Sequence, residues 1–495
     1  MIKNIPTKYY DLLNDLGMFN GITDDSREVT AGNLFVAGGG NHLSDTYIYH
    51  AIENGAAAIV GPSCLKRNYP VPYIVSPDGL KYKSQLASRF FRNPSERVIL
   101  IGVTGTCGKT TTTYLLESIF LKAGKKVGVI GTENYRYDGR VFPSSNTTPG
   151  TIKLNNLIRM MKDAGCEVVV MEVSSHALAQ ERIEGLSFDG AIFTNLTHDH
   201  LDFHLTMESY YQTKKKLFFE YANATDKTFH AVINKANDFG HRLYCEIEAQ
   251  CFKNYELKSF CLDSTDASIS LSPDLYSIEI KSKDFERTIR SNLIGRFNAE
   301  NVLGAATLAA SLGVDSKYVS AGIMEMSHVP GRMNRIDRSG RTIVVDFAHK
   351  PGALLEVITT LKPMTRGELI VVFGCGGARD QEKRPEMGKI AATFANHIIV
   401  TSDNQRGENI DSITSQIVSG IKSLRATGFE VVKDRREAIE TAMRRSKNGD
   451  LILIAGRGSE GQLNIYNSAT RKYEDINFSD MTVAQESAQI FISPN

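Results

Sequence analysis

Short apolar runs alternate with longer amphipathic stretches along much of this 495-residue chain. In the middle of the chain the runs predict buried parallel strands of one sheet, at Val98–Ile101, Val127–Ile130, Glu167–Met171 and Gly190–Thr194. Nearer the C-terminus similar runs predict a second parallel sheet, at Ile343–Asp346, Leu369–Phe373, His397–Thr401 and Leu451–Ala455. Strands that alternate with helices in this way are typical of doubly wound α/β domains.

A smaller α/β unit is predicted before these two sheets. Leu34–Ala37 and Ala58–Val60 have the pattern of short buried strands, with a helix near Asp45–Asn54 between them. Asn93-Pro94 marks a break in the chain, and Val329-Pro-Gly-Arg332 has the composition of a hinge. We therefore expect three α/β domains: a small N-terminal domain (1–90), a central phosphate-loop domain with a parallel sheet (91–328) and a C-terminal Rossmann-like domain (329–495).

Composition narrows the classes of function. The net charge of +1 gives no reason to expect a nucleic-acid partner. No apolar run approaches the roughly 20 residues of a membrane span, and Met1–Pro6 lacks a signal-peptide core. The seven cysteines include no Cys-x-x-Cys pair, which favours reduced thiols. We expect a cytoplasmic monomer that acts on small molecules, without a membrane partner.

The segment Gly102-Val-Thr-Gly-Thr-Cys-Gly-Lys-Thr-Thr111 joins a predicted strand to a helix-like stretch. This is the context of a phosphate-binding loop. Gly105 and Gly108 permit a tight turn, and the positive end of the following helix favours an anion. Lys109 would reach the outer phosphates of a nucleotide, and the Thr110 hydroxyl would ligate Mg²⁺. The alternative is an ordinary glycine-rich turn; five residues rather than the common four separate Gly102 from Gly108.

A glutamate and a histidine each follow a predicted strand of the central sheet. Glu172 comes after Glu167–Met171, and His200 follows Gly190–Thr194. Ligands bind at the carboxyl ends of strands in such sheets, so both side chains could hold a divalent ion beside the phosphate loop. The alternative is a capping acid and a surface histidine. A run of three lysines, 214–216, by itself indicates only a solvated helix face.

Three polar loops follow strands of the C-terminal sheet, at Gly374–Asp380, Asp403–Arg406 and Gly456–Glu460. Arg379 and Arg406 could bind carboxylates in bidentate fashion, and a Glu suits an ammonium group. Together they suit a zwitterionic small molecule, although ordinary loop capping is the alternative. A nucleotide site facing a carboxylate site suggests activation of an acid for attack by an amine.

Several further motifs carry a family resemblance. They are Thr23-Asp-Asp-Ser-Arg27, Gly105-Thr-Cys-Gly-Lys-Thr-Thr111, Asn146-Thr-Thr-Pro149, Met171-Glu-Val-Ser-Ser-His176, Thr194–Asp202, Gly295–Asn301, Val329–Met333, Val345–His349, Gly374–Gly377, Lys383-Arg-Pro385 and Asp403-Asn-Gln-Arg406. In this order they resemble the Mur ligases, and among them the UDP-N-acetylmuramoyl-tripeptide synthetases (the MurE type). The resemblance spans nearly the whole chain.

The resemblance implies an ATP-dependent amide ligase of cell-wall (peptidoglycan) precursor synthesis. ATP phosphorylates the D-glutamate carboxylate of UDP-MurNAc-L-Ala-D-Glu, and the amine of an amino acid attacks the acyl phosphate. ADP and phosphate leave. Folylpolyglutamate synthases share the ATPase core but lack the N-terminal domain, so they fit less well.

The resemblance also implies roles for individual residues. It places ATP at Gly105, Thr106, Cys107, Gly108, Lys109, Thr110, Thr111, Asn301, Arg332 and Asp346. It places the UDP-muramyl substrate at Ser26, Thr147, Thr148, Ser174, Gln180 and Arg182, and the incoming amino acid at Arg379, Asn404, Arg406, Gly456 and Glu460. Two Mg²⁺ ions are implied, with ligands from Thr110, Glu172, His200 and Lys214, the lysine as a carbamate formed with CO₂. Lys109, Glu172, His200 and Lys214 would form the catalytic set.

The chain departs from the family pattern at several positions. Cys107 replaces Asn, Phe347 replaces Tyr, Gly352 and Ala378 replace Asp, Gln405 replaces Pro, Arg457 replaces Lys and Ser459 replaces His. Because Arg379, Arg406 and Glu460 are kept, our hypothesis for the amino acid is meso-diaminopimelate. Two alternatives stay open: a paralogous ligase of specialised metabolism with another amine or acyl substrate, and a non-catalytic sensor of UDP-muramyl metabolites.

Overall fold

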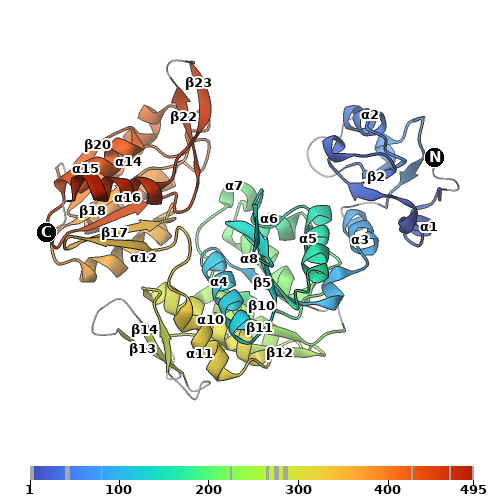
Figure 1. Ribbon diagram of the computed structural model, residues 1–495, viewed down its shortest axis with the longest axis horizontal. Coiled ribbons are helices and arrows are strands. Elements are labelled where there is room, and N and C mark those ends of the chain that lie inside the picture. The colour runs from blue at the N-terminus through green and yellow to red at the C-terminus, as the bar shows by residue number, and fades with distance from the viewer. Residues whose placement is uncertain are drawn as a thin grey trace.

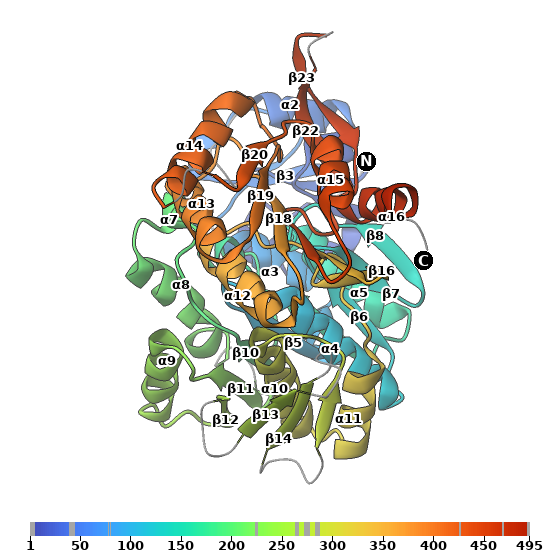
Figure 2. The ribbon, with the colours of Figure 1, turned by 90° about the vertical axis from the view of Figure 1, so that its left-hand side faces the viewer.

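The computed structural model describes residues 5–38, 45–77, 79, 81–222, 226–262, 267–271, 278–282, 288–424, 427–467 and 470–492. Figure 1 shows three units: an N-terminal unit in blue, a central unit in cyan to yellow, and a C-terminal unit in orange and red. The C-terminal unit lies over one end of the central unit, as the turned view in Figure 2 also shows. No helix of the described residues is long and apolar enough to cross a membrane.

The N-terminal unit is built on a four-stranded parallel sheet. Its strands lie in chain order, as β1 (Gly21–Thr23), β2 (Asn33–Val36), β3 (Ala58–Gly61) and β4 (Tyr73–Val75). Its helices are α1 (Tyr9–Leu12), α2 (Asp45–Glu53) and α3 (Lys81–Phe90). The Ser84 hydroxyl of α3 donates to the Glu181 carbonyl of the central unit at 3.0 Å, so α3 connects the two units.

The central unit contains an eight-stranded sheet in the order β12-β11-β10-β5-β9-β6-β7-β8. The strands are β5 (Ile99–Thr104), β6 (Val127–Ile130), β7 (Asn134–Tyr137), β8 (Arg140–Pro143), β9 (Val168–Glu172), β10 (Gly190–Phe193), β11 (Phe229–Asn234) and β12 (Tyr255–Phe260). All pairs are parallel except those of the edge strands β7 and β8. After β12 the chain forms a small antiparallel sheet of β13 (Ala267–Leu271), β14 (Ile278–Ser282) and β15 (Ile289–Ser291).

Helices cover both faces of the central sheet. They are α4 (Lys109–Lys122), α5 (Thr151–Asp163), α6 (Ser175–Ala179), α7 (Leu201–His204), α8 (Met207–Phe219), α9 (Asp238–Glu248), α10 (Arg296–Ser311) and α11 (Ser316–Glu325). Consecutive strand residues point to opposite faces: Leu100 packs with α5, α8 and α9, whereas Ile101 packs with α4, α10 and α11. The inner strands β5, β6, β9 and β10 are therefore apolar over almost their whole length, as the sequence pattern predicts.

The C-terminal unit has a six-stranded sheet in the order β16-β17-β21-β18-β19-β20. The elements are β16 (Asn334–Arg338), β17 (Arg341–Asp346), β18 (Leu369–Phe373), β19 (His397–Val400), β20 (Phe429–Val431) and β21 (Leu451–Ala455), with the hairpin β22 (Gln462–Asn467) and β23 (Lys472–Asn477). Its helices are α12 (Pro351–Leu361), α13 (Lys383–Phe394), α14 (Ile410–Lys422), α15 (Arg435–Arg445) and α16 (Asp480–Phe491). Helices α12 to α14 pack on one face, and α15 and α16 pack on the other.

The α/β class with parallel sheets is confirmed, and each of the ten strands predicted above has a counterpart in the structure. Three of them, Val127–Ile130, Leu369–Phe373 and Leu451–Ala455, have the predicted ends. The domain boundaries after residues 90 and 328 stay predictions.

Replacing Asp480 by alanine is expected to destabilise the protein by about 3–5 kcal/mol. Arg435 and Asp480 form a fully buried ion pair with two hydrogen bonds of 2.7 Å, which joins α15 to α16. The variant would leave the Arg435 guanidinium buried without its carboxylate. Urea unfolding followed by circular dichroism measures the loss.

The matched control is Glu486→Ala, which removes the half-exposed Arg436–Glu486 pair between the same two helices. It should cost no more than about 1 kcal/mol. Equal effects of the two variants would contradict the special weight given to the buried pair.

Candidate active site

The phosphate-loop segment leads from β5 into α4. Gly105 and Gly108 have φ values of +149° and +87°, which side chains rarely adopt. A Cβ on Gly105 would lie 1.9 Å from the Thr194 hydroxyl, so only glycine fits there. The backbone amides of Thr106 and Cys107 donate to Asn195, at 2.9 Å each. Because these two amides already have partners, the N-terminus of α4, which begins at Lys109, is the part of the loop best placed to bind an anion.

Two lysines converge on this loop. Lys109 Nζ donates to the carbonyls of Gly105 and Thr106, at 2.9 and 3.0 Å. Lys214, on α8, is 1% exposed, and its Nζ donates to the Gly105 carbonyl at 3.0 Å. Burial lowers the pKa of both amines, and repulsion from Lys109 lowers that of Lys214 further. The two amines thus lie together at the loop, where the phosphates of a nucleotide would supply the negative charge that favours their protonated forms.

Glu172 ends β9 and is also buried, at 1% exposed. One carboxylate oxygen accepts from the Thr110 hydroxyl at 3.0 Å and from the Thr132 amide at 2.8 Å, and the other accepts from the Thr132 hydroxyl at 3.0 Å. Thr110 and Glu172, both predicted metal ligands, are therefore adjacent. Their oxygens are the kind of donor that Mg²⁺ prefers.

His200 follows β10 in a left-handed backbone conformation, with φ of +54°. Its Nε2 lies 3.0 Å from Asp199 Oδ2, which also accepts from Lys350 Nζ of the C-terminal unit. Burial alone would raise the pKa of Asp199, but His200 and Lys350 together hold it well below its ordinary value. Asp199 is therefore a carboxylate held between two basic groups.

The residues predicted for the muramyl substrate form one cluster, apart from Ser26. The Thr148 hydroxyl donates to the Glu172 carbonyl at 2.8 Å and accepts from the Ser174 amide at 3.0 Å. Arg182 donates to the Thr148 carbonyl at 2.8 Å and to Gln180 at 2.7 Å. The Thr147 hydroxyl lies 2.9 Å from that of Thr132. This cluster is continuous with the Glu172 carboxylate.

A second set of charged groups lies at the strand ends of the C-terminal sheet. The Asn404 amide donates to Glu460 Oε2 at 3.0 Å. Fully buried Arg457 lies 3.2 Å from the same oxygen and 3.4 Å from Asp403. Burial raises the pKa of Glu460 and Arg457 opposes the rise, whereas Arg435 and Arg457 lower the pKa of Asp403 despite its burial. Arg457 thus fixes a carboxylate beside the predicted amino-acid pocket.

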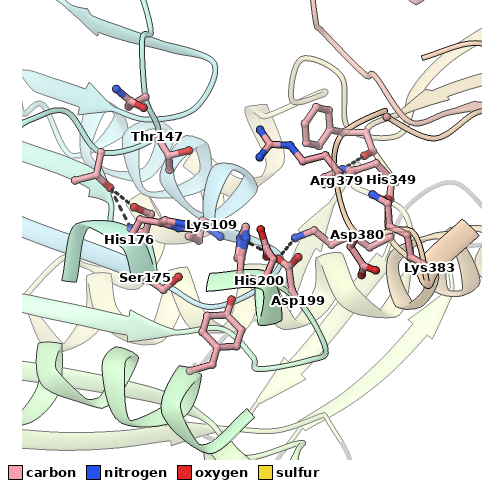
Figure 3. A pocket seen from close by; sticks show the side chains of 18 of the residues that line it. Lys109, Thr147, Ser175, His176, Asp199, His200, His349, Arg379, Asp380 and Lys383 are labelled. Carbon is pink, nitrogen blue, oxygen red and sulfur yellow. Dashed lines mark hydrogen bonds and ion pairs between the residues drawn. The ribbon is translucent and has the colours of Figure 1, made fainter. Parts of the chain in front are cut away.

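One cavity of about 500 Å³ joins these groups. Figure 3 shows side chains of the central unit, such as Lys109, Thr147 and His200, facing Arg379 and Lys383 of the C-terminal unit. Of the predicted site residues, the cavity is lined by Gly105, Lys109, Thr147, Thr148, Ser174, Arg182, His200, Lys214, Arg379, Asn404, Arg406, Gly456 and Glu460. The sequence pattern therefore selects groups that share one space although they come from two units.

Other predicted residues lie outside that lining. Thr106, Thr110, Thr111 and Glu172 are buried, Cys107 and Gly108 are partly buried, and Gln180 is exposed. Asn301 lies against the phosphate loop, since a Cβ on Gly108 would stand 2.3 Å from its Oδ1. Arg332 packs on the Phe347 ring at 4.2 Å, and both oxygens of buried Asp346 accept backbone amides. Ser26 lies in the N-terminal unit, 3.1 Å from His50 Nδ1.

Several lining residues were not selected from the sequence: Asp199, Lys350, His349, Asp380, Lys383 and Tyr210. Asp380 and Asp199 follow strands β18 and β10, so the rule that ligands gather at strand ends could have found them. Lys350 precedes α12, and its partner lies 151 positions away in the sequence. No local pattern signals such a pair.

A predicted phosphate loop that shares one cavity with a cluster of Arg, Asn and Glu side chains is the arrangement expected of an enzyme in which a nucleotide meets a carboxylate and an amine. The family models agree: residues 103–309 match the Mur ligase middle domain, and residues 331–458 match the Mur ligase, glutamate ligase domain.

Curated relatives are similar over most of the chain. A UDP-N-acetylmuramoyl-L-alanyl-D-glutamate–2,6-diaminopimelate ligase of Geobacter metallireducens is 39% identical, with 89% of each chain covered. A ligase of the same name from Aquifex aeolicus is 37% identical, with 97% of this chain and 95% of the relative covered. The chain belongs to the Mur ligase family, as its motifs predict.

Solved structures agree in fold. A structure of a UDP-N-acetylmuramoyl-L-alanyl-D-glutamate–2,6-diaminopimelate ligase superposes with a TM-score of 0.67 at 29% identity, covering 95% of each chain. The MurF ligase of Thermotoga maritima, solved in complex with ADP, superposes with a TM-score of 0.63 at 21% identity, covering 90% of this chain and 95% of that one. The three-unit architecture is therefore that of the family.

Proposed function

We propose that this protein is an ATP-dependent ligase that joins meso-diaminopimelate to the D-glutamate carboxylate of UDP-MurNAc-L-Ala-D-Glu. The reaction would serve peptidoglycan precursor synthesis in the cytoplasm, with the protein acting as a monomer. The main observation is the single cavity in which Lys109 and Lys214 face Arg406 and Glu460 from another unit. A phosphorylated acid on one side and an amine on the other would meet there without release of the intermediate.

The nucleotide would bind with its phosphates at the N-terminus of α4. Lys109 would exchange its two carbonyl acceptors for phosphate oxygens, which accept more strongly because they are charged. Asn301, Arg332 and Asp346 would contact the adenine, a phosphate and the ribose. The positions of Asn301 beside Gly108 and of Arg332 near Asp346 support this assignment.

The residues present fit a Mg²⁺ ion beside these phosphates. Thr110 and Glu172 would supply two oxygens. Among the described residues no three His, Cys, Asp or Glu side chains form a ready metal cluster, but Mg²⁺ commonly completes its shell with phosphate oxygens and water. Bound Mg²⁺ would disperse the charge of the transferred phosphoryl group. His200 and a carbamate on Lys214 would hold the second ion.

The carbamate is proposed because Lys214 is unusual as a free amine. Its side chain is buried, it lies near Lys109, and within the described part of the chain no carboxylate pairs with its Nζ. Reaction with CO₂ would convert a costly buried cation into an anion that binds metal. The two neighbouring acceptors, the Gly105 carbonyl and the Thr104 hydroxyl, would then require a shift of the terminal group.

The acyl substrate would lie along the central unit. Thr147, Thr148, Ser174 and Arg182 would contact its muramyl-dipeptide part, with the carboxylate directed toward the phosphates. Ser26 would contact the uridine part from the N-terminal unit. The shared hydrogen bonds of Thr148 with Glu172 and Ser174 support a fixed relation between this substrate and the metal site.

The amine would bind in the C-terminal unit. Arg379 and Arg406 would bind carboxylates, and Glu460 would accept from an ammonium group. The substituted positions Ala378, Gln405, Arg457 and Ser459 do not line the cavity. Gln405 accepts from the Tyr466 amide, and Ser459 donates to Glu133. Arg457 acts on the pocket only through Glu460, which it holds at 3.2 Å. Because Glu460, Arg379 and Arg406 themselves are kept, the pattern favours diaminopimelate over a different amine.

The test is phosphate release from ATP with UDP-MurNAc-L-Ala-D-Glu and a panel of amines: meso-diaminopimelate, L-lysine and L-ornithine. Turnover that depends on meso-diaminopimelate supports the proposal. Turnover with another amine would favour the paralogous ligase, and nucleotide binding without turnover on any amine would favour the sensor.

Replacing Arg406 by alanine is expected to raise KM for diaminopimelate roughly 10- to 100-fold, the loss of a charge-assisted contact. KM for ATP should change little, because Arg406 is not among the residues assigned to ATP and lies in the loop after β19 with Asn404 of the proposed amine site. The backbone at position 406 is left-handed, with φ of +46°. Arginine and alanine adopt this conformation at similar cost, so the substitution should not strain the loop. Steady-state kinetics with each substrate varied measures the split.

The matched control is Arg366→Ala, an exposed arginine of the same unit that does not line the cavity. It should leave both KM values unchanged. An equal rise in KM for ATP and diaminopimelate in Arg406→Ala would count against a role in binding the amine.

A further inference from the structure

Lys350 is a cation that the C-terminal unit extends into the centre of the site. Its Nζ donates to Asp199 Oδ2 in the loop after β10, and the two side chains are 16% and 14% exposed. Both residues line the cavity with Lys109 and Lys214. Figure 3 shows Asp199 beside His200, at the point where the two units face each other. Lys350 therefore lies among the proposed active-site residues of the central unit, although it belongs to the C-terminal unit.

The backbone around Lys350 is firmly held. Lys350 is the extended residue before α12, with φ −130° and ψ 153°, and Pro351 fixes the first turn of that helix. On the other side, the His349 carbonyl accepts from Lys383 Nζ at 2.9 Å, and the His349 ring contacts the Phe347 carbonyl at 2.8 Å. The Cα of Lys350 is therefore fixed, while its four-carbon stem keeps its freedom.

Lys350 lines the same cavity as Lys109, at the start of α4, and Lys214, on α8, and interacts electrostatically with both. Burial lowers the pKa of Lys109 and Lys214, and the charge of Lys350 lowers both further. The side chains of Lys109, Lys214 and Lys350 thus share one region of the cavity, with Asp199 as a carboxylate among them. Such a cluster is favourable when a multiply charged anion enters it.

Asp199 can release Lys350 at low cost. Its Oδ2 also lies 3.0 Å from His200 Nε2, so the carboxylate keeps a partner when the ammonium leaves. The terminal phosphate of ATP carries more charge than a carboxylate and offers three acceptor oxygens. An ammonium on a flexible stem would therefore move from Asp199 to that phosphate.

We propose that Lys350 contacts the terminal phosphate of bound ATP, with Asp199 as its partner when no nucleotide is bound. The C-terminal unit would then contribute a charge to phosphoryl transfer, and that charge is in place only when this unit lies against the central unit. The proposal rests on the proposed function for the identity of the nucleotide. It does not depend on which acid or amine is joined.

The experiment compares Lys350→Met with the native chain in binding two nucleotides with Mg²⁺, by calorimetry. The probes are the β,γ-imido analogue of ATP and ADP. Loss of one charge-assisted contact should weaken the triphosphate roughly 10-fold or more and leave ADP within about twofold. Lys350→Arg, which keeps the charge, should retain most of the triphosphate affinity.

Lys389→Met is the matched control, since Lys389 is an exposed lysine of α13 in the same unit. It should change neither affinity. Should Lys350→Met fold poorly, Lys350→Gln gives the same comparison with a polar side chain.

Equal weakening of both nucleotides would mean that Lys350 only anchors the two units, and no weakening of either would exclude contact with the phosphate. Both outcomes overturn the proposal. Native protein that binds the ATP analogue but turns over no amine would overturn the proposed function and leave this inference standing.

Discussion

Lys109→Ala is expected to lower kcat by roughly 10²–10³-fold, the loss that follows removal of one preorganised donor to a developing charge. Lys109 is the lysine at the start of α4, and its Nζ already lies within 3.0 Å of two loop carbonyls. The helix N-terminus and Thr110 would still bind phosphate, so binding of ADP should fall less than kcat. Phosphate release and ADP binding, measured on the same variant, separate the two effects.

Lys109→Arg sharpens this prediction. The planar guanidinium is larger than an ammonium and cannot donate to the closely spaced carbonyls of Gly105 and Thr106 in the same way. It should therefore fail to restore turnover. Lys122→Ala, at the exposed end of the same helix, is the control and should keep native kcat. A kcat for Lys109→Ala within tenfold of the native value would sink the assignment.

The inner part of the fold is predictable from the sequence because the central parallel strands of the two large sheets are covered on both faces. Val127–Ile130 and Leu369–Phe373 are apolar throughout and bounded by turns, which leaves little choice of element. The hairpin β22–β23 lies at the surface and contains mostly polar residues, so its sequence carries no apolar run. Edge strand β16, with the sequence Asn-Arg-Ile-Asp-Arg, was missed for the same reason.

The site is predictable as far as strand ends determine it. Glu172 ends a buried strand of the central sheet, and Asn404 and Glu460 follow buried strands of the C-terminal sheet. In each parallel sheet the topology brings such positions to one edge. By contrast, Lys214 lies on a helix among three lysines, and the sequence pattern alone does not distinguish it from its neighbours. Packing does: Lys214 is buried, whereas Lys215 pairs with Glu246 at the surface side of α8.

Local sequence patterns do not predict the contacts between units. The pairs Lys350–Asp199 and Ser459–Glu133 join segments far apart in the chain, and each depends on how two separately folded sheets meet. No periodicity within either segment encodes the partner. Charged residues in loops that follow strands are candidates for such contacts, and the structure is needed to pair them.

Lys214→Met is expected to lower kcat on the order of 10³-fold, because the variant loses both the proposed carbamate and the second metal ion that it would hold. Methionine nearly matches the lysine stem in length and suits a buried position, so packing around α8 should survive. Phosphate release in the presence of both substrates measures the loss.

The run of three lysines supplies its own control. Lys216→Met changes a partly exposed neighbour on the same helix and should keep native turnover. After incubation with carbon-13 bicarbonate, a carbamate signal in the NMR spectrum should be present in the native chain and in Lys216→Met but absent in Lys214→Met. Full turnover of Lys214→Met would refute the carbamate outright. Loss of turnover without a carbamate signal in the native chain would mean that Lys214 acts as an ammonium, donating directly to phosphate beside Lys109.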